Sequence, residues 1–286
     1  MDYVCRVLCC LFLILLALSA SAAGPEQPVT DVIPRPRIMQ SPGPLLPLGN
    51  GGTVRIGLTG TSVTERGAVQ RGHRLFEARL DELGARCKVV ENPGEADLII
   101  RKAREEELQG LLKGLEVSED VKGDRLRQAY VLRVRGKGGR AQVIVRGCSE
   151  RGVFYGLVSL CQLVEESEQG APVIKTLTIG DYPEVARRLA KTSGTHNPLK
   201  KVQRYGSWMP LFKLSMMGIQ FHGKNSRRPD ENFTENVRTL CPLARESGTL
   251  ETVVYFCPFR GQGYDLSTQQ GRNRYVDYVR KLLSFG

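Results

Sequence analysis

The chain has 286 residues, 41% of them apolar, with 41 Lys and Arg against 30 Asp and Glu and a formal net charge of +11. This length predicts one or two domains, at about 100–200 residues each. The basic residues are scattered among acids, and aromatic side chains do not alternate with them as a nucleic-acid stacking platform requires. We therefore expect no nucleic-acid partner, but a solvated basic surface with some attraction to anionic glycans or cell wall.

Residues 1–23 have the three parts of a secretory signal peptide. Arg6 gives a positive start, an apolar run covers 8–18, and Ala20-Ser21-Ala22 is a small-x-small cleavage signal. The run is too short to span a bilayer, which takes about 20 apolar residues. We expect a secreted, extracellular or periplasmic protein that begins near Ala23 and keeps no stable membrane anchor. The alternatives are an uncleaved anchor or a wrongly placed start codon.

The cysteine and histidine pattern predicts neither a metal site nor a cofactor. Five of the eight cysteines follow the signal peptide, so at least one is unpaired: Cys87, Cys148, Cys161, Cys241 and Cys257. No CxxC motif occurs, and we expect no acid at ligand spacing from His73 or His196. Buried free thiols are the expected state of the cysteines in apolar stretches.

Residues 24–52 are rich in Pro and Gly and predict a flexible leader, with order beginning at Thr53. Helices are then predicted from periodicity at 63–83, 103–117 and 150–166. Short β-rich runs predict strands at 54–58, 87–90, 97–100, 128–135, 142–146 and 173–179. Residues 53–180 are thus expected to form a compact α+β domain.

A second region, 181–286, alternates between strand and helix patterns. Strands are predicted at 189–192, 219–222 and 252–256, and helices at 198–217, 233–246 and 271–283, although Pro210 and Pro242 interrupt two of these helices. A parallel sheet needs helices on both faces, and a (β/α)₈ barrel takes about 250 residues. The region predicts either a small open sheet or a partial, TIM-barrel-like (β/α) segment.

Two stretches are specific enough to indicate a family. Residues 130–163 contain Tyr-Val-Leu-Arg-Val, then Gln-Val-Ile-Val-Arg-Gly, then Ser-Glu-Arg-Gly-Val-Phe-Tyr-Gly-Leu, and residues 179–184 are Ile-Gly-Asp-Tyr-Pro-Glu. Gly147 and Gly152 would allow a tight strand-to-helix turn. Together the stretches resemble the non-catalytic N-terminal domain of β-N-acetylhexosaminidases, which precedes the barrel in glycoside hydrolase families 20 and 84.

The resemblance extends more weakly into 181–286, where 212–224 is similar to the family's passage into the second barrel strand. It implies substrate-assisted hydrolysis of N-acetylglucosamine-containing glycans, with an adjacent acidic pair after the fourth strand. Because the chain ends after about three strands, we expect it to contain no catalytic residues. The pair Asp230-Glu231 is expected to serve only as acids favoured at a helix N-terminus.

Two residues are candidates for contact with a sugar. Lys224 matches a lysine that helps to bind the sugar in family 84 enzymes, and His222 is adjacent to it; exposed loop polarity is the alternative. Ser193-Gly194-Thr195 is a weaker candidate for the same mouth. The expected function is that of a secreted relative of the β-N-acetylhexosaminidases without its catalytic pair. A non-catalytic glycan- or wall-binding protein and a truncated, non-functional product are the alternatives.

Overall fold

The computed structural model describes residues 32–40, 43–60, 67–117, 120–193, 209–220, 238, 251–255 and 265–284, and the structural statements below concern these residues. The proposed signal peptide and the predicted helix at 233–246, apart from residue 238, lie outside them. Among the described residues, no helix combines the length and the apolar character that a membrane span requires.

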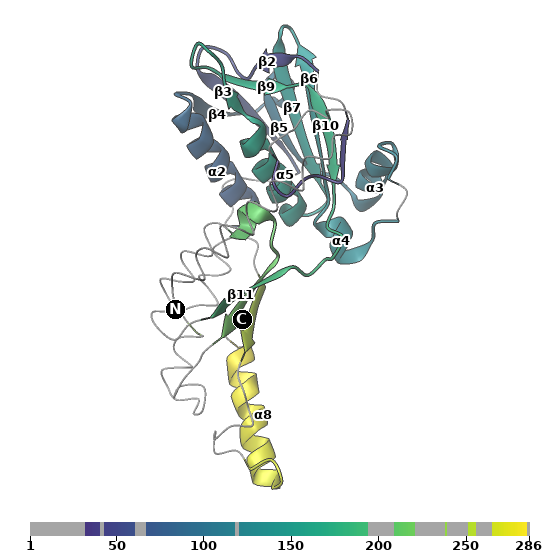
Figure 1. Ribbon diagram of the computed structural model, residues 1–286, viewed down its shortest axis with the longest axis vertical. Coiled ribbons are helices and arrows are strands. Elements are labelled where there is room, and N and C mark those ends of the chain that lie inside the picture. Colours follow the sequence, from purple (N-terminus) through teal and green to yellow (C-terminus); the bar gives the residue numbers. More distant parts are fainter. Residues whose placement is uncertain are drawn as a thin grey trace, which may run out of the picture. The chain divides into compact units, whose positions relative to one another are not determined.

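A seven-stranded mixed sheet forms the centre of the region that follows residue 32 (Figure 1). Its order is β1-β10-β6-β7-β5-β3-β4, with β4, β3, β5 and β7 parallel, and β6, β10 and β1 antiparallel to their neighbours. The strands are β1 (Ile38–Gln40), β3 (Thr53–Thr59), β4 (Arg86–Val90), β5 (Leu98–Lys102), β6 (Tyr130–Lys137), β7 (Arg140–Gly147) and β10 (Leu177–Asp181).

Helices cover both faces of this sheet. Helices α2 (Ala68–Glu82) and α5 (Glu150–Leu163) lie on one face, and α3 (Glu105–Lys113) and α4 (Gly123–Arg127) on the other (Figure 1). Strand β6 shows the alternation that this layering requires: Tyr130 and Leu132 join the α2/α5 core, whereas Val131 joins the α3/α4 core. The predicted α+β domain is therefore confirmed as a mixed α/β fold.

The prediction of a flexible leader up to residue 52 is wrong for its second half. Strand β1 pairs with β10, and β2 (Leu45–Pro47) pairs with β9 (Pro172–Lys175). Short β8 (Glu165–Glu166) completes a three-stranded sheet of order β2-β9-β8. Local pattern did not reveal β1 and β2, because their backbone groups are satisfied by strands far along the chain.

Two other predicted boundaries also change. The single strand predicted at 173–179 is two strands, β9 and β10, which belong to different sheets. Between them Thr176 exchanges backbone hydrogen bonds with Gly43 and Pro44, at 2.6 and 3.0 Å. Helix α5 ends at Leu163 instead of 166, because the next residues pair with β9 as β8. A short 3₁₀ turn, η2 (Pro93–Glu95), precedes β5.

The region after residue 188 contains a separate parallel sheet. Strands β11 (Leu189–Ser193), β12 (Met216–Gln220) and β13 (Glu251–Tyr255) are neighbours in chain order, and α8 (Gln269–Leu283) follows. The helix predicted at 198–217 is wrong at its C-terminal end. There the chain forms one 3₁₀ turn, η3 (Met209–Phe212), which contains Pro210, and then enters β12. The described residues contain these three strands and no closed barrel.

The strand-to-helix turn between β7 and α5 is as tight as the sequence predicts. Ser149 Oγ accepts hydrogen bonds from the N–H groups of Arg151 and Gly152, at 3.2 and 3.3 Å, and caps the helix. A Cβ atom at Gly147 would lie 2.5 Å from the nitrogen of Val153, and one at Gly152 would overlap the carbonyl oxygen of Ala129. Only glycine allows this close approach of helix and sheet.

We therefore expect Gly152→Ala to lower the free energy of unfolding by about 2 kcal/mol, because the added methyl group forces backbone atoms apart. The matched control is Gly110→Ala in α3, where an added Cβ meets nothing within 4 Å. Its better helix propensity should leave stability unchanged or raise it by up to about 1 kcal/mol. Urea denaturation followed by circular dichroism measures both, and equal effects would contradict this account of the turn.

Candidate functional site

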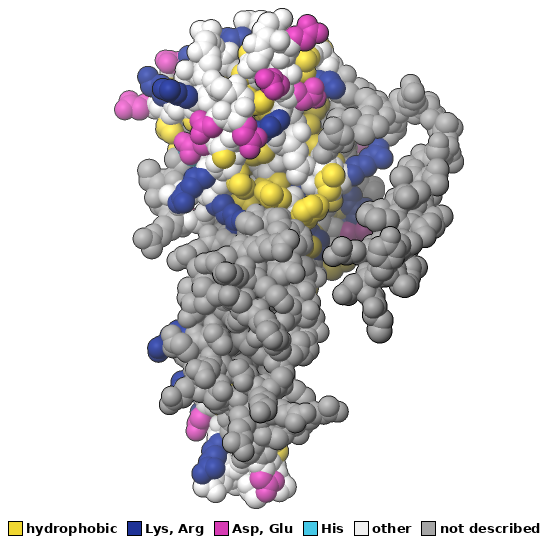
Figure 2. Space-filling view, turned by 60° about the vertical axis from the view of Figure 1, so that its left-hand side comes forward, with side chains coloured by type: hydrophobic (Ala, Val, Ile, Leu, Met, Phe, Trp, Pro, Cys, Tyr) yellow, Lys and Arg dark blue, Asp and Glu magenta, His cyan; other side chains and the backbone are white. Residues whose placement is uncertain are grey.

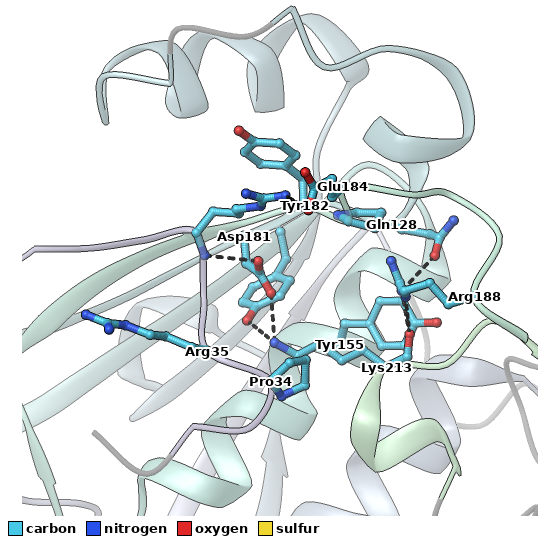
Figure 3. A pocket seen from close by; sticks show the side chains of 12 residues that line it. Pro34, Arg35, Gln128, Tyr155, Asp181, Tyr182, Glu184, Arg188 and Lys213 are labelled. Atoms are coloured by element: carbon cyan, nitrogen blue, oxygen red, sulfur yellow. Dashed lines mark hydrogen bonds and ion pairs between the residues drawn. The ribbon is translucent and has the colours of Figure 1, made fainter. Parts of the chain in front are cut away.

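A polar pocket of about 270 Å³ lies where the chain leaves the seven-stranded sheet (Figure 3). Asp181 is the last residue of β10, and Tyr182-Pro183 follows it out of the sheet. Proline has no N–H to continue a ladder, so the strand ends here. The other lining residues come from the start of β6, from α5, from the stretch before β1, and from the segments next to β11 and β12: Pro34, Arg35, Arg37, Gln128, Tyr130, Tyr155, Glu184, Arg188 and Lys213.

Lys213 is the central cation of the pocket. Its Nζ donates to Asp181 Oδ2 at 2.8 Å and to the Tyr130 hydroxyl at 2.9 Å (Figure 3). The side chains of Lys213 and Asp181 are only 5% and 11% exposed. Because an ammonium group only donates, the Tyr130 oxygen accepts this bond, and its own proton can go to Ser159 Oγ at 2.6 Å. The polar groups of this buried cluster therefore satisfy one another.

Burial and charge act in opposite directions on these groups. Removal from water lowers the pKa of Lys213, and the carboxylate of Asp181 opposes this shift. The pKa of Tyr130 is raised well above its ordinary value, chiefly by burial and then by Asp181. Lys213 also has a φ of 55°, a left-handed conformation that costs a residue with a side chain about 1–2 kcal/mol. The ion pair thus holds the chain in a conformation that it would not adopt alone.

Arg188 ties the same segment to the sheet from the opposite side. Its Nε donates to the Lys213 carbonyl oxygen at 2.8 Å, and its Nη2 donates to Gln128 Oε1 at 3.0 Å and also to the Lys213 carbonyl. Its guanidinium lies 5.7 Å from the ring centre of Tyr155, in a cation–π contact. The Arg188 carbonyl accepts from the N–H groups of Ser215 and Met216. The two chain segments that lead into β11 and β12 are therefore joined before either strand begins.

The mouth of the pocket is charged and more open. Arg37 pairs with Glu184 at 2.8 Å, with side chains 37% and 78% exposed. Arg37 and Arg125 both lie over the ring of Tyr182, at 5.7 and 5.3 Å from its centre. Each carboxylate that lines the pocket is thus paired with a cation. This arrangement holds chain segments in position. Among the described residues of the pocket, no carboxylate is left unpaired to act as a catalytic acid or base.

The structure does not test the two residues proposed from sequence as sugar contacts. His222 and Lys224 lie outside the described residues, as do His196 and Asp230-Glu231, so their roles stay predictions. The pocket instead depends on Lys213 and Arg188, whose partners the sequence did not reveal. One signal was present: Lys213 is a single charge within the apolar run 211–217, and such a residue is seldom buried without a partner.

Elsewhere in the described part of the chain, three side chains of the kinds that bind metal ions lie together on α2 and β4. The expectation that no acid lies at ligand spacing from His73 is wrong, because Glu77 follows one helical turn later and its Oε2 is 3.2 Å from His73 Nδ1. With Cys87 Sγ, their ligand atoms all lie within 4.8 Å of one another. Burial, followed by Glu77, raises the pKa of Cys87 to about 12, so the thiol is protonated at neutral pH. Cys87, Cys148 and Cys161 are free thiols, as the sequence predicts for Cys148 and Cys161 in their apolar stretches, but all three are half-buried instead of buried.

The Lys213–Asp181 pair generates a test of the pocket. Lys213→Met leaves a buried carboxylate without its cation, and we expect the free energy of unfolding to fall by about 3 kcal/mol. The matched control, Arg37→Gln, breaks a largely exposed pair and should cost at most about 1 kcal/mol. Adding Asp181→Asn to Lys213→Met should restore part of the loss. Urea denaturation measures all variants, and equal losses for Lys213→Met and Arg37→Gln would contradict the central role of Lys213.

Solved structures share this architecture. CpGH84B aligns with a TM-score of 0.60 at 18% identity, covering 90% of this chain and 42% of that one. For the β-N-acetylhexosaminidase from Bacteroides fragilis NCTC 9343 the TM-score is 0.58 at 15% identity, and the alignment covers 89% of this chain and 55% of that one. For the exo-β-N-acetylglucosaminidase from Vibrio harveyi in complex with N-acetylglucosamine the TM-score is 0.53 at 12% identity, and the alignment covers 79% of this chain and 36% of that one. The likeness is one of fold, and the chain spans roughly half or less of each of these proteins.

The sequence comparison is more specific. No curated protein sequence matches the chain. The family described as glycosyl hydrolase family 20, domain 2 matches residues 29–182, which is more than half of the chain. The match begins before β1 and ends at Tyr182, within the pocket, and it confirms the resemblance found in the stretches 130–163 and 179–184. The chain therefore belongs to the protein family described as glycosyl hydrolase family 20, domain 2.

Proposed function

We propose that this protein is an exported relative of the β-N-acetylhexosaminidases, in which the seven-stranded domain supports the first strands of a (β/α) barrel that binds N-acetylglucosamine-containing glycans. The observation that carries the proposal is the parallel sheet β11-β12-β13. Its strands are neighbours in chain order, as consecutive strands are in such a barrel. They follow directly after the domain that matches the family.

The register of these strands supports a binding mouth at one edge. Leu189 pairs with Met216 and Met216 with Glu251, so the strands start level, and Ser193, Gln220 and Tyr255 end level. Barrel enzymes bind their substrates at this carboxyl edge. In the sequence, His222 and Lys224 come soon after Gln220. We propose that these two side chains contact the sugar.

The carboxylates of the described pocket give no support to hydrolysis. Asp181 and Glu184, the carboxylates of the pocket, are each engaged by a cation. The resemblance implies an acidic pair after a fourth strand, and the described parallel sheet has three. We therefore propose that this chain alone binds the glycan without cleaving it.

The binding proposal predicts that the full chain is retained on chitin beads and released by N-acetylglucosamine oligomers. Hydrolysis of 4-nitrophenyl N-acetyl-β-glucosaminide should stay at the rate of the buffer. Lys224→Ala should reduce retention, whereas the control Lys88→Ala, an exposed lysine on β4, should not. Hydrolysis above the buffer rate would contradict the non-catalytic proposal, and failure of the wild-type chain to bind would contradict glycan recognition.

The export proposal predicts a cleaved N-terminus. When the complete gene is expressed in a secreting host, the mature protein should begin near Ala23. Ala22→Arg should block cleavage, because signal peptidase sites require small residues, and Ala17→Ser inside the apolar run should not. Intact-mass measurement and N-terminal sequencing give the result. Wild-type protein that keeps Met1 would favour an uncleaved anchor, and a product that starts elsewhere would favour a wrong start codon.

A further inference from the structure

Four arginines share one face of the central strands, and we call them the arginine cluster: Arg101 of β5, Arg133 and Arg135 of β6, and Arg146 of β7. Arg146 lies directly opposite Arg101 in the parallel ladder and opposite Val131 in the antiparallel one. Cross-strand partners point to the same face, and residues two apart on a strand do too. Because Val131 belongs to the α3/α4 core, the arginine cluster lies on that side of the sheet.

A small cavity of about 60 Å³ opens beside three of the four arginines. Arg133, Arg135 and Arg146 form its polar lining, and Leu111, Val131 and Ile144 form its apolar part. A water molecule needs about 10–15 Å³ of such volume, so the cavity has room for a group of several heavy atoms. It is therefore large enough for one compact oxyanion, with three guanidinium groups around it.

The positive charge of the cluster is poorly compensated. Glu107 pairs with Arg101 at 3.3 Å, and Arg135 donates to the neutral amide oxygen of Gln142 at 2.7 Å. Arg146 Nε is buried and has no hydrogen-bond partner among the described residues. Its pKa is lowered, first by burial and then by Arg101, with Arg133 and Arg135 acting in the same direction and Glu107 opposing them. Like charges opposite one another destabilise a sheet.

The described part of the side drawn in Figure 2 does not show this segregation. On the side drawn in Figure 2, Lys and Arg side chains lie among Asp and Glu side chains, as the sequence predicts for a solvated surface. A cluster with several guanidinium groups, a buried donor without an acceptor, and a cavity beside it is a different arrangement. Such an arrangement attracts anions.

We propose that the arginine cluster binds the tetrahedral oxyanion of a sulfate or phosphate ester. Guanidinium groups present paired N–H donors that match two oxygens of such a group. Donors that approach from two strands can hold more than two oxygens, which a planar carboxylate does not offer. The site uses none of the pocket residues around Lys213, and it does not depend on the proposed hexosaminidase relationship.

Isothermal titration calorimetry with the full chain tests this site. Sodium sulfate and sodium phosphate are titrated against a chloride background of equal ionic strength, followed by N-acetylglucosamine 6-sulfate, N-acetylglucosamine 6-phosphate and N-acetylglucosamine. We expect saturable binding of the oxyanions and of the matching ester, and none of the unmodified sugar at this site. The two esters distinguish a sulfated from a phosphorylated source.

Variants decide whether the arginine cluster is the site. Arg133→Gln and Arg146→Gln should each weaken oxyanion binding about tenfold or more, because a charged hydrogen-bond donor is lost. The control Arg74→Gln removes the same charge from an exposed position on α2, which covers the other face of the sheet, and should bind as the wild type does. Equal weakening in all three variants would overturn the proposal in favour of general charge attraction, as would wild-type affinity in both cluster variants.

Circular dichroism of each variant checks that the fold is kept. Arg146 is half-buried, so Arg146→Gln could lower stability, whereas Arg133 is exposed and its replacement should not. If Arg146→Gln does not fold, Arg133→Gln alone still decides: unchanged affinity overturns the site, and about tenfold weaker binding supports it.

Discussion

The arrangement of this protein after β10 depends on one ammonium group that has been taken out of water. Lys213 is buried beside Asp181 and Tyr130, and its charge is tolerated because both partners lie at hydrogen-bond distance. The same residue is in a left-handed backbone conformation. If the segment 213–215 left the sheet, a buried carboxylate and a tyrosine would lose their partner. The pair therefore fixes the point from which β12 starts, and Arg188 fixes the start of β11 in relation to it.

The seven-stranded domain is suited to this supporting role because a hydrophobic core fills each face of its sheet. Helix α5 packs so tightly on the sheet that glycine is required at Gly152, and the alternation along β6 fills a core on each face. Charged side chains gather at two places that matter here. In the pocket around Lys213 each carboxylate is paired with a cation, whereas in the arginine cluster Arg146 Nε has no hydrogen-bond partner among the described residues. The first arrangement holds parts of the chain together, and the second is open to a ligand.

These two sites would serve one protein in different ways. The pocket sets the direction of the parallel strands, whose carboxyl edge is the proposed glycan mouth. The arginine cluster occupies the sheet face beside α3 and recognises charge instead of sugar hydroxyls. The arginine cluster would engage only the ester oxyanion of a ligand, whereas the proposed mouth would contact the sugar itself. The sequence shows only an excess of basic residues. In the described part of the chain, the arginine cluster is where this positive charge is arranged to select a ligand, because four arginines from three strands share one face of the sheet.

What the sequence by itself determined was local. The periodicity of α2, α5 and α8, the β-rich runs of β3 to β7, the Ser149 cap and the motif ending in Asp181-Tyr182-Pro183 can all be recognised from neighbouring residues, and they were sufficient to indicate the family. Tertiary structure alone decided what those residues meet. Strands β1 and β2 exist because distant strands pair with them, the thiol of Cys87 on β4 lies near His73 on α2, and Lys213 finds Asp181 only after the chain has folded. Such partners are chosen by non-local packing and by the high cost of burying an unpaired charge, neither of which leaves a pattern in adjacent residues.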